Sequence, residues 1–357
     1  MKNENRQRSC SCRSVFWGVG VILFLILCFV IFAREPLKEG GERNEPITVQ
    51  GFYLNTSVQI TSYDPVEENL LRDALALCDQ YEKKFSRTRE DSELYKLNHG
   101  LLPKEDGWVL LSEESAELIR QGLFYSELSQ GAFDITIEPV SSLWDFTSED
   151  PALPNPRDVE QAVPKVGYED VELQGNRIRF LKEGMGIELG AIAKGYIADR
   201  IKEFLIEQGV EHAIIDLGGN ILCVGNRPDG EPFRVGIQKP FAKRSETVAM
   251  AKIADRSVVS SGIYERFFEK NGELYHHILD PKSGYPYENE LLAVTIFSDH
   301  SIDGDALSTT CYALGLEKGR KLIDSLPKIQ AVFLTKDGKM HYSQQAEKYV
   351  SFIEKEK

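Results

Sequence analysis

Asp305 and Thr309 are the two side chains whose types and spacing point most directly to chemistry. They stand four residues apart in a predicted helix over residues 304–316, so they lie on one face, one turn apart. A carboxylate and a hydroxyl placed this way can both bind a hard cation such as Mg²⁺, which takes oxygen ligands and leaves positions for substrate phosphate. Capping of the helix by Asp303 or Asp305 is the structural alternative. A calcium loop over residues 299–310 fails because it ends in Thr where the last position requires Glu.

Residues 188–195 read Glu-Leu-Gly-Ala-Ile-Ala-Lys-Gly and lead into a second predicted helix over residues 193–208. Backbone groups exposed at such a helix start can contact a phosphate or a metal, and Lys194 adds positive charge there. An ordinary turn before an amphipathic helix is the alternative.

His276 and His277 precede a turn that proline and glycine stiffen, residues 278–286. A neutral histidine can accept the proton of an attacking hydroxyl near physiological pH. Adjacent side chains on a strand face opposite ways, so at most one of the two should face a given site. A structural role for the histidines is the alternative.

Two further segments could contact a ligand. Residues 131–136 place an aromatic ring and a carboxylate after a tight turn, which could hold an adenine or flavin ring or could belong to the core. Residues 257–262 are small and rich in hydroxyls, so a ligand could approach their backbone; a polar turn is the alternative.

The elements that must position these residues follow an α+β pattern without regular alternation of strand and helix. Helical periodicity covers residues 65–87, and a capped helix begins at Ser112. The predicted strands are residues 52–62, 212–217, 233–238, 249–253, 292–298 and 330–335.

Charge excludes some classes of partner. The 357-residue chain has a formal net charge of −14, and its first 33 residues carry +3, so the remainder carries about −17. This balance argues against nucleic acid as a partner, and any phosphate ligand must be met by local charges. Cys78, Cys223 and Cys311 are widely spaced, which indicates neither a disulfide framework nor a cysteine metal site.

The N-terminal part predicts attachment to a membrane. Residues 1–14 are basic and should stay in the cytoplasm, and the uncharged residues 15–33 are about long enough to span a bilayer as a helix. We expect this segment to be an anchor or signal, with residues 34–46 as a linker and a folded domain over 47–357 outside the cytoplasm. A lipoprotein signal ending at Cys28 is the weaker alternative, because a leucine precedes the cysteine.

Taken together and in order, the short motifs resemble successive signatures of the ApbE family, the FAD:protein FMN transferases. The match spans essentially the whole predicted exported part. Its segments are residues 92–98, 131–136, 190–195, 216–220, 260–266, 277–286 and 305–309.

The resemblance implies a T-fold-related α+β domain of mixed sheets with flanking helices. It also implies FAD as substrate, Mg²⁺ near its pyrophosphate, and transfer of FMN to a threonine of another protein with release of AMP. The acceptors would be exported or membrane-bound flavoprotein subunits with a short motif containing Asp and Thr. On matching positions, the metal would be held by the Ala191 carbonyl, Asp305 and Thr309, and His277 is the candidate base.

The resemblance also implies contacts with FAD, at Leu54, Ala132, Phe133, Asp134, Glu188, Lys194, Leu279 and Ser308. One departure is the first strand, where the family commonly has Met-Gly-Thr and this chain has Leu54-Asn55-Thr56. Asn adds bulk where the family has Gly, which bears on the affinity or orientation of FAD.

Three other functions stay open from the residues. The same site could hydrolyse FAD to FMN and AMP with water in place of threonine. The chain could instead be an extracytoplasmic flavin-binding protein without turnover, or an adhesion or scaffold domain that binds no flavin.

Overall fold

An eight-stranded antiparallel sheet forms the centre of the fold in the computed structural model, which describes residues 45–243 and 245–352. Its strands lie in the order β1-β2-β7-β8-β11-β14-β15-β16, and every neighbouring pair is antiparallel. The strands β14 and β15 are buried along most of their length because both faces of the sheet are covered. The eight strands are β1 (Ile47–Tyr53), β2 (Thr56–Ser62), β7 (Ala213–Leu217), β8 (Asn220–Val224), β11 (Ser257–Gly262), β14 (Leu291–Ser298), β15 (Gln330–Thr335) and β16 (Met340–Tyr342).

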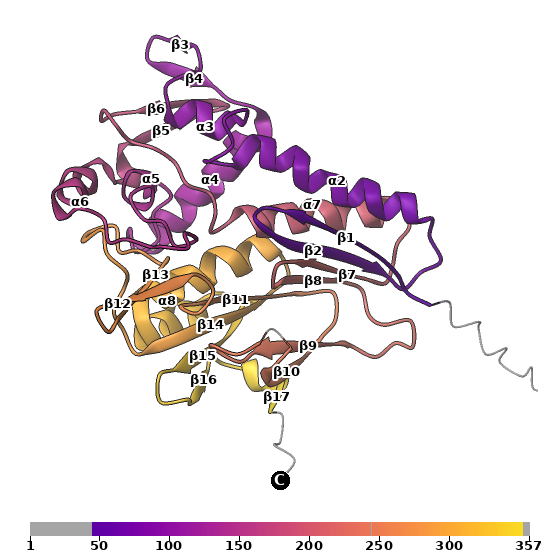
Figure 1. Ribbon diagram of the computed structural model, residues 1–357. Coiled ribbons are helices and arrows are strands. Elements are labelled where there is room, and N and C mark those ends of the chain that lie inside the picture. Colours follow the sequence, from indigo (N-terminus) through magenta and orange to yellow (C-terminus); the bar gives the residue numbers. More distant parts are fainter. Residues whose placement is uncertain (1–44, 244, 353–357) are drawn as a thin grey trace, which may run out of the picture. The chain divides into compact units, whose positions relative to one another are not determined.

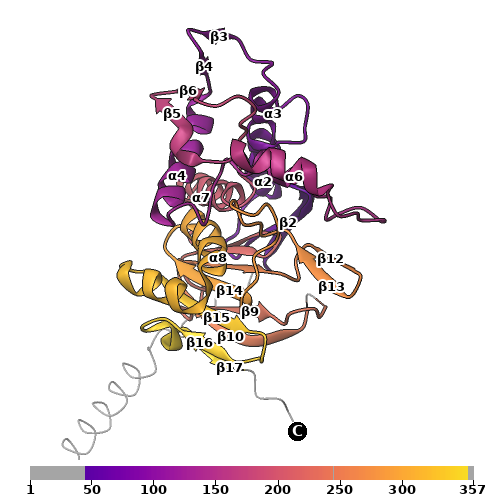
Figure 2. The same ribbon diagram turned by 90° about the vertical axis from the view of Figure 1, so that its left-hand side faces the viewer.

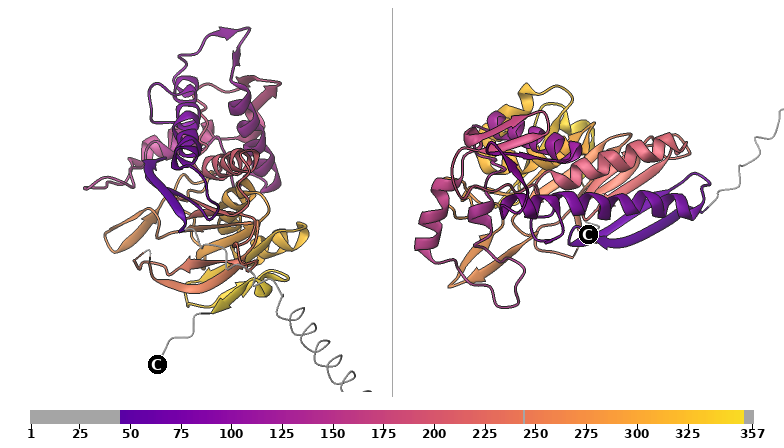
Figure 3. Two further views of the ribbon diagram at one scale, coloured as in Figure 1. Left: turned by 90° about the vertical axis from the view of Figure 1, so that its right-hand side faces the viewer. Right: turned by 90° about the horizontal axis from the view of Figure 1, so that it is seen from above.

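Three helices cover one face of this sheet (Figure 1): α2 (Glu68–Phe85), α7 (Ala193–Glu207) and α8 (Ser301–Ser325). The apolar stripe of α7 faces the core, where Ile197, Ile201 and Leu205 are fully buried. Seen from above in Figure 3, α2 and α7 lie side by side, and the rings of Tyr81 and Tyr196 meet edge to face at 5.6 Å.

A small sheet in the order β17-β10-β9 covers the other face of the main sheet. Its strands are β9 (Phe233–Gln238), β10 (Thr247–Ile253) and β17 (Val350–Phe352). Phe233, Ile237 and Ile253 of this sheet pack against Cys223 and Phe297 of the main sheet in a second apolar cluster. The fold therefore has a helix layer, a central sheet and a second sheet.

The remaining elements lie at the end of the helix layer and beside the main sheet (Figure 2). A four-stranded sheet runs in the order β3-β4-β6-β5, and β12 and β13 form a hairpin of their own. The elements are α3 (Glu93–Asn98), β3 (Lys104–Glu105), β4 (Trp108–Leu110), α4 (Glu113–Leu128), α5 (Glu138–Ser141), α6 (Pro156–Ala162), β5 (Val171–Gln174), β6 (Arg177–Phe180), β12 (Phe267–Lys270) and β13 (Glu273–His276), with short 3-10 turns at Val163–Lys165, Tyr168–Asp170 and Ala346–Lys348.

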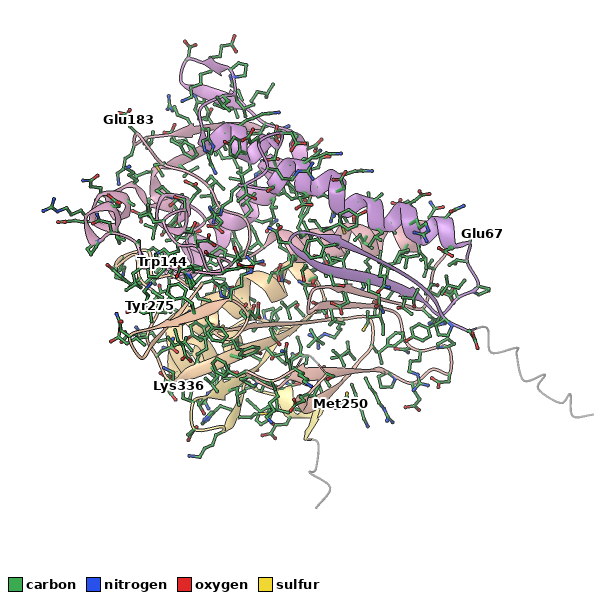
Figure 4. All side chains as sticks on the ribbon, in the orientation of Figure 1. Glu67, Trp144, Glu183, Met250, Tyr275 and Lys336 are labelled. Carbon is green, nitrogen blue, oxygen red and sulfur yellow. The ribbon has the colours of Figure 1, made fainter. Side chains whose placement is uncertain are left out.

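A group of aromatic rings fastens the β12–β13 hairpin to the segment after α5. The Trp144 ring lies 6.0 Å from that of Tyr275 and 6.4 Å from that of Phe268, and Figure 4 labels Trp144 and Tyr275 close together. Aromatic pairs at such distances add stabilisation beyond their buried area. They hold in place the strand that ends at His276.

The expectation of an α+β fold is confirmed, and two element predictions need correction. The single strand predicted over residues 52–62 is wrong, because Leu54 and Asn55 adopt positive φ values of 53° and 56° and turn the chain into the β1–β2 hairpin. The helix predicted over 304–316 is part of α8, which begins earlier and continues past a break at Gly315 (φ 75°).

None of the helices in the described ranges is both long and apolar enough to span a membrane. The anchor or signal predicted for residues 15–33 lies outside these ranges. From Pro46 on, the chain forms one compact unit.

Candidate active site

The site is built where α7 and α8 begin side by side. Gly195 allows this approach, because a Cβ at that position would lie 2.4 Å from the Ser301 carbonyl oxygen. The Asp199 carboxylate on α7 accepts hydrogen bonds from the backbone N–H groups of Ser301 (2.7 Å) and Ile302 (3.0 Å), so it caps α8 from a neighbouring helix. Burial raises the pKa of Asp199 to about 6, against the lowering effect of these hydrogen bonds.

Asp305 lies on the first turns of α8 and is 5% exposed. Its carboxylate accepts hydrogen bonds from the Gly195 N–H (2.6 Å) and from the Asn220 side-chain amide (2.9 Å). Burial raises its pKa, while the positive charge of Lys194 and these two donors oppose the shift. In the described part of the chain, no Lys, Arg or His forms an ion pair with Asp305 within 4.0 Å. A buried carboxylate with only neutral direct partners is costly, and a cation would compensate it.

Asn220 aims its amide at Asp305 because its other end is held. Its side-chain oxygen accepts a hydrogen bond from the Ser301 hydroxyl (2.7 Å), which in turn contacts the Ser257 hydroxyl at 3.1 Å. Asn220 is 1% exposed. This buried chain of hydrogen bonds fixes which atom of Asn220 faces the carboxylate.

The Ala191 carbonyl lies outside the hydrogen-bond ladder of α7, because Ala191 precedes the N-cap residue Ile192. The Gly195 N–H is one of the first-turn donors that find no acceptor within the helix, and it donates to Asp305. Within residues 45–243 and 245–352 no backbone N–H donates to the Ala191 carbonyl, whereas Tyr196 does donate to Ile192. The Ala191 carbonyl oxygen is thus without a backbone donor in the turn that leads to Gly195, the residue that contacts Asp305.

Hydroxyl groups of α8 and β11 complete this side of the site. The Ser261 hydroxyl lies 2.7 Å from that of Ser308 and 3.2 Å from that of Thr309. Ser308 also donates to the Asp305 backbone carbonyl at 3.0 Å. Ser308 is buried, whereas Thr309 is partly exposed, so Thr309 is the more accessible oxygen.

Lys194 connects these oxygens with the histidine segment. Its positive charge lowers the pKa values of Asp305, Glu265 and His277, which places all four groups in one electrostatic neighbourhood. The residue Glu265 is exposed as a whole, yet desolvation by surrounding protein raises its carboxyl pKa, and the Asp305 charge adds to the shift.

The two adjacent histidines have different environments. His276 is 4% exposed, and its Nε2 donates to the Tyr287 carbonyl (3.0 Å) while its Nδ1 accepts the Ile278 N–H (3.3 Å). His277 is partly exposed, and its Nδ1 donates to the Arg266 carbonyl (3.2 Å), because a carbonyl can only accept. That contact leaves Nε2 of His277 as the proton acceptor. Desolvation, with the charge of Arg266, lowers its pKa to about 3, so the ring is neutral at pH 7.

Glu188 lies in a polar group at the end of α2. Its carboxylate is 3.3 Å from the Arg87 guanidinium and accepts a hydrogen bond from Ser141. Its backbone N–H donates to the Ile135 carbonyl at 2.7 Å. Glu188 therefore links the segment before α7 to the segment 131–136.

The segment 131–136 uses most of its polar groups internally. The Phe133 ring is in the core at 5% exposure, and the Asp134 carboxylate accepts hydrogen bonds from Thr136 and from the Tyr168 N–H (3.0 Å). Ala132 is partly exposed, and its carbonyl accepts the Tyr287 hydroxyl at 3.0 Å. Of the three predicted FAD contacts here, Ala132 is the accessible one.

Leu54 and Leu279 are apolar predicted contacts in two other places. Leu54 is partly exposed in the β1–β2 turn. Leu279 is 8% exposed and packs with Trp144 and Phe268 in a small cluster under the β12–β13 hairpin.

The ligand roles of the site residues stay predictions. Hydrogen bonds among the start of α7, the start of α8 and β11 bring together the elements that carry or adjoin Ala191, Lys194, Asp305, Ser308 and Thr309.

The donor set suits a hard cation held by few protein ligands. In the described ranges no three His, Cys, Asp or Glu side chains gather into a group that could hold a metal. Mg²⁺ does not require such a group, since it is commonly bound by one or two carboxylates together with water and substrate phosphate. The buried Asp305 carboxylate, the Ala191 carbonyl and the Thr309 hydroxyl are oxygen ligands of this kind.

Sequence reasoning assigned no roles to Asn220, Asp199, Ser261 or Arg87. Asn220 and Ser261 stand inside motifs that were recognised, but their partners on α8 come from distant segments. The Gly-Gly-Asn turn before β8 was the signal that could have pointed to Asn220.

Comparisons with known proteins agree with this fold. The ApbE family matches residues 54–333. An FAD:protein FMN transferase of Treponema pallidum (strain Nichols) is 32% identical, covering 92% of this chain and 94% of its own. One of Klebsiella pneumoniae (strain 342) is 37% identical, covering 76% of this chain and 84% of its own. The crystal structure of the ApbE protein of Thermotoga maritima matches with a TM-score of 0.77 at 30% identity, covering 85% of this chain and 99% of its own.

The layered α+β fold is thus shared with an ApbE protein of known structure. The chain belongs to the ApbE family. The resemblance drawn from its short motifs is confirmed.

Proposed function

We propose that this chain is an FAD:protein FMN transferase, which cleaves FAD, attaches FMN to a threonine of an acceptor protein and releases AMP. Its family and the names of its relatives support the flavin transfer. The observation that carries the site assignment is the hydrogen bond from the first-turn Gly195 N–H of α7 to the buried Asp305 carboxylate. This contact sets the carboxylate at the start of α7, next to the segment whose Ala191 carbonyl accepts no backbone N–H within the described ranges.

The Ala191 carbonyl, Asp305 and Thr309 would hold Mg²⁺. When bound, the ion would neutralise charge that develops on the pyrophosphate. The fit rests on the buried carboxylate with neutral partners and on the Ala191 carbonyl, which accepts no backbone N–H in the described ranges.

The chain's own residues have distinct tasks in the proposed reaction. Lys194 and the N-terminus of α7 provide positive charge and dipole for the pyrophosphate. His277 accepts the threonine proton at Nε2, because its Nδ1 is occupied by the Arg266 carbonyl. The threonine oxygen forms a bond to the FMN phosphorus, and the bond from that phosphorus to the bridging oxygen breaks. AMP leaves with the bridging oxygen.

The test uses the full chain in detergent with FAD and Mg²⁺, with and without exported redox subunits that contain an Asp- and Thr-containing motif. AMP release and the mass of each subunit are followed together. AMP release matched by a gain of one FMN on a subunit supports the transferase. AMP without a labelled subunit supports FAD pyrophosphatase activity at the same site. Intact FAD under every condition would contradict both activities and indicate a flavin-binding protein without turnover.

We also propose that residues 15–33 anchor the chain and that the domain from residue 47 acts outside the cytoplasm. The basic residues 1–14 and the uncharged run support this orientation. Protease added to intact spheroplasts should digest the domain, and protection until the membrane is lysed would contradict the proposal.

A further inference from the structure

The chain presents an aromatic ring in a strained backbone position near the histidine segment. Phe241 lies between β9 and β10, is 52% exposed and has a φ of 56°. A bulky residue at positive φ is a true outlier, and such conformations typically cost about 1–3 kcal/mol. Strain of this kind persists where the surrounding structure enforces it.

Lys239 and Glu246, on either side of Phe241 in the connection between β9 and β10, are joined by two contacts. The Lys239 N–H donates to the Glu246 carbonyl at 2.9 Å, and the side chains of the same two residues form an ion pair at 3.5 Å. The Ala242 N–H donates back to the Lys239 carbonyl at 3.3 Å. The backbone that carries the Phe241 ring is therefore held by hydrogen bonds.

Phe241 packs edge to face on two rings of another segment. Its ring centroid lies 6.0 Å from that of Tyr264 and 5.3 Å from that of Phe267. We call these three residues the Phe241 patch. All three are partly or largely exposed, so the patch offers apolar area to a partner.

The Phe241 patch is directly connected to the proposed base. Tyr264 and Phe267 flank Glu265 and Arg266 in the sequence, and the Arg266 carbonyl accepts both the backbone N–H (3.1 Å) and the Nδ1–H (3.2 Å) of His277. A partner seated on the patch thus lies beside the group that would take the proton of the acceptor hydroxyl.

We propose that the Phe241 patch is the docking surface for the acceptor protein and receives an apolar side chain near the threonine that is modified. This inference rests on the proposed function. The patch favours this occupant because it adjoins His277, which only a hydroxyl donor needs to reach. Exposed aromatic rings with charged neighbours, here Glu265 and Arg266, have the composition of interface hot spots.

The test measures the KM for the flavoprotein subunit that the wild-type full chain labels, together with FAD affinity and AMP release without acceptor. Phe241→Ala should raise that KM by about 5- to 30-fold, the range expected when an aromatic anchor is lost. FAD affinity and AMP release without acceptor should stay unchanged.

Phe124→Ala is the matched control. Phe124 on α4 is 53% exposed and also packs edge to face on a tyrosine, Tyr125, at 5.2 Å. It should leave the acceptor KM unchanged. Phe241→Gly adds a second readout, because glycine adopts the positive φ without strain, whereas Phe241→Ala loses the same ring contacts and keeps the strain. It should be more thermally stable than Phe241→Ala while it weakens acceptor use as much, which a folding defect could not do.

Each other outcome overturns the inference. Equal acceptor KM values for wild type and Phe241→Ala would show that the Phe241 patch is not the docking surface. The proposed transferase function would still stand. A weaker FAD affinity in Phe241→Ala would assign the ring to the flavin. If the wild type labels no subunit, the proposed function fails and the docking surface fails with it.

Discussion

At the scale of single residues, Asp305 has a carboxylate whose burial costs folding free energy and whose position suits the binding of a cation. Its carboxylate is buried, its pKa is raised by desolvation, and its direct partners Gly195 and Asn220 are neutral donors. Such a group contributes little to stability on its own and a great deal to the binding of a cation. The arrangement of α7 and α8 around it is therefore explained better by ligand binding than by folding.

Asp305→Ala should lower the rate of AMP release by at least about 100-fold, comparable to the loss of one strong electrostatic group in an active site. The variant should stay folded, because the substitution removes a buried charge. Mn²⁺ binding followed by electron paramagnetic resonance should be lost in parallel. Asp303→Ala is the control, since Asp303 accepts a hydrogen bond from Tyr125 and belongs to the scaffold. Normal turnover in Asp305→Ala would remove the metal-ligand assignment.

His276 predicts how stability depends on pH. Burial lowers its pKa from the ordinary 6.5 to about 4, and its Nδ1 is occupied by the Ile278 N–H. Between pH 6.5 and about pH 4, His276 is protonated in the unfolded chain and neutral in the folded chain. The free energy of unfolding therefore falls as the pH falls. By pH 5 the loss from this group is about 2 kcal/mol, from 1.36 kcal/mol per pKa unit.

Comparison with His276→Gln isolates this effect, because Asp199, whose pKa is raised to about 6, changes stability with pH in the opposite direction. Urea unfolding at pH 7.5 and pH 5 measures the free energy of unfolding of both proteins. The stability advantage of the wild type should shrink on acidification. An advantage that stays constant would mean that His276 does not titrate with folding.

At the scale of elements, the site depends on the close approach of two helix starts. A Cβ on Gly195 would lie 2.4 Å from the Ser301 carbonyl oxygen and 2.6 Å from the Ile302 Cα. Both are backbone atoms, which cannot move aside as a side chain would. Gly195→Ala must therefore shift α7 against α8.

We expect Gly195→Ala to lower the free energy of unfolding by about 1–3 kcal/mol, the usual cost of overpacking. It should also weaken Mn²⁺ binding, because the Gly195 N–H would no longer hold the Asp305 carboxylate. Gly190→Ala is the control, since a Cβ there meets nothing closer than Glu188 Oε1 at 3.5 Å. Equal metal affinity in the two variants would show that the helix approach does not position the site.

The elements also show which parts the sequence could predict. Periodicity placed α7 within one residue, because its apolar stripe is local information. The β1–β2 hairpin was missed because Asn55 was the only turn residue there, and Leu54 beside it is not a residue type that favours positive φ. The hydrogen bonds of Asp134 to Thr136 and Tyr168 could not be predicted, because Tyr168 comes near only on folding, and the contact of Asp134 with FAD stays a prediction. The motifs indicated the candidate residues, and contacts between distant segments show which of their atoms already have partners.

At the scale of the whole molecule, the negative net charge of the chain repels the anionic substrate of the proposed reaction. The chain has a net charge of −14, and in the proposed function the anionic pyrophosphate of FAD is met locally by Lys194. At about 0.01 M ionic strength fields extend about 30 Å, whereas at 0.15 M they extend about 8 Å. At low salt, repulsion from the acidic surface should slow the approach of FAD, and at higher salt the local positive groups should dominate.

The association rate of FAD should therefore rise a few-fold between about 10 mM and 150 mM NaCl at constant Mg²⁺, the reverse of the usual behaviour of phosphate ligands. Stopped-flow flavin fluorescence measures this rate. Neutral riboflavin is the control, because its association should not depend on salt. A rate that falls with salt would mean that the positive charge around Lys194 and the start of α7 reaches beyond the acidic surface. In that case the site itself, and not the molecule as a whole, would govern the approach of the substrate.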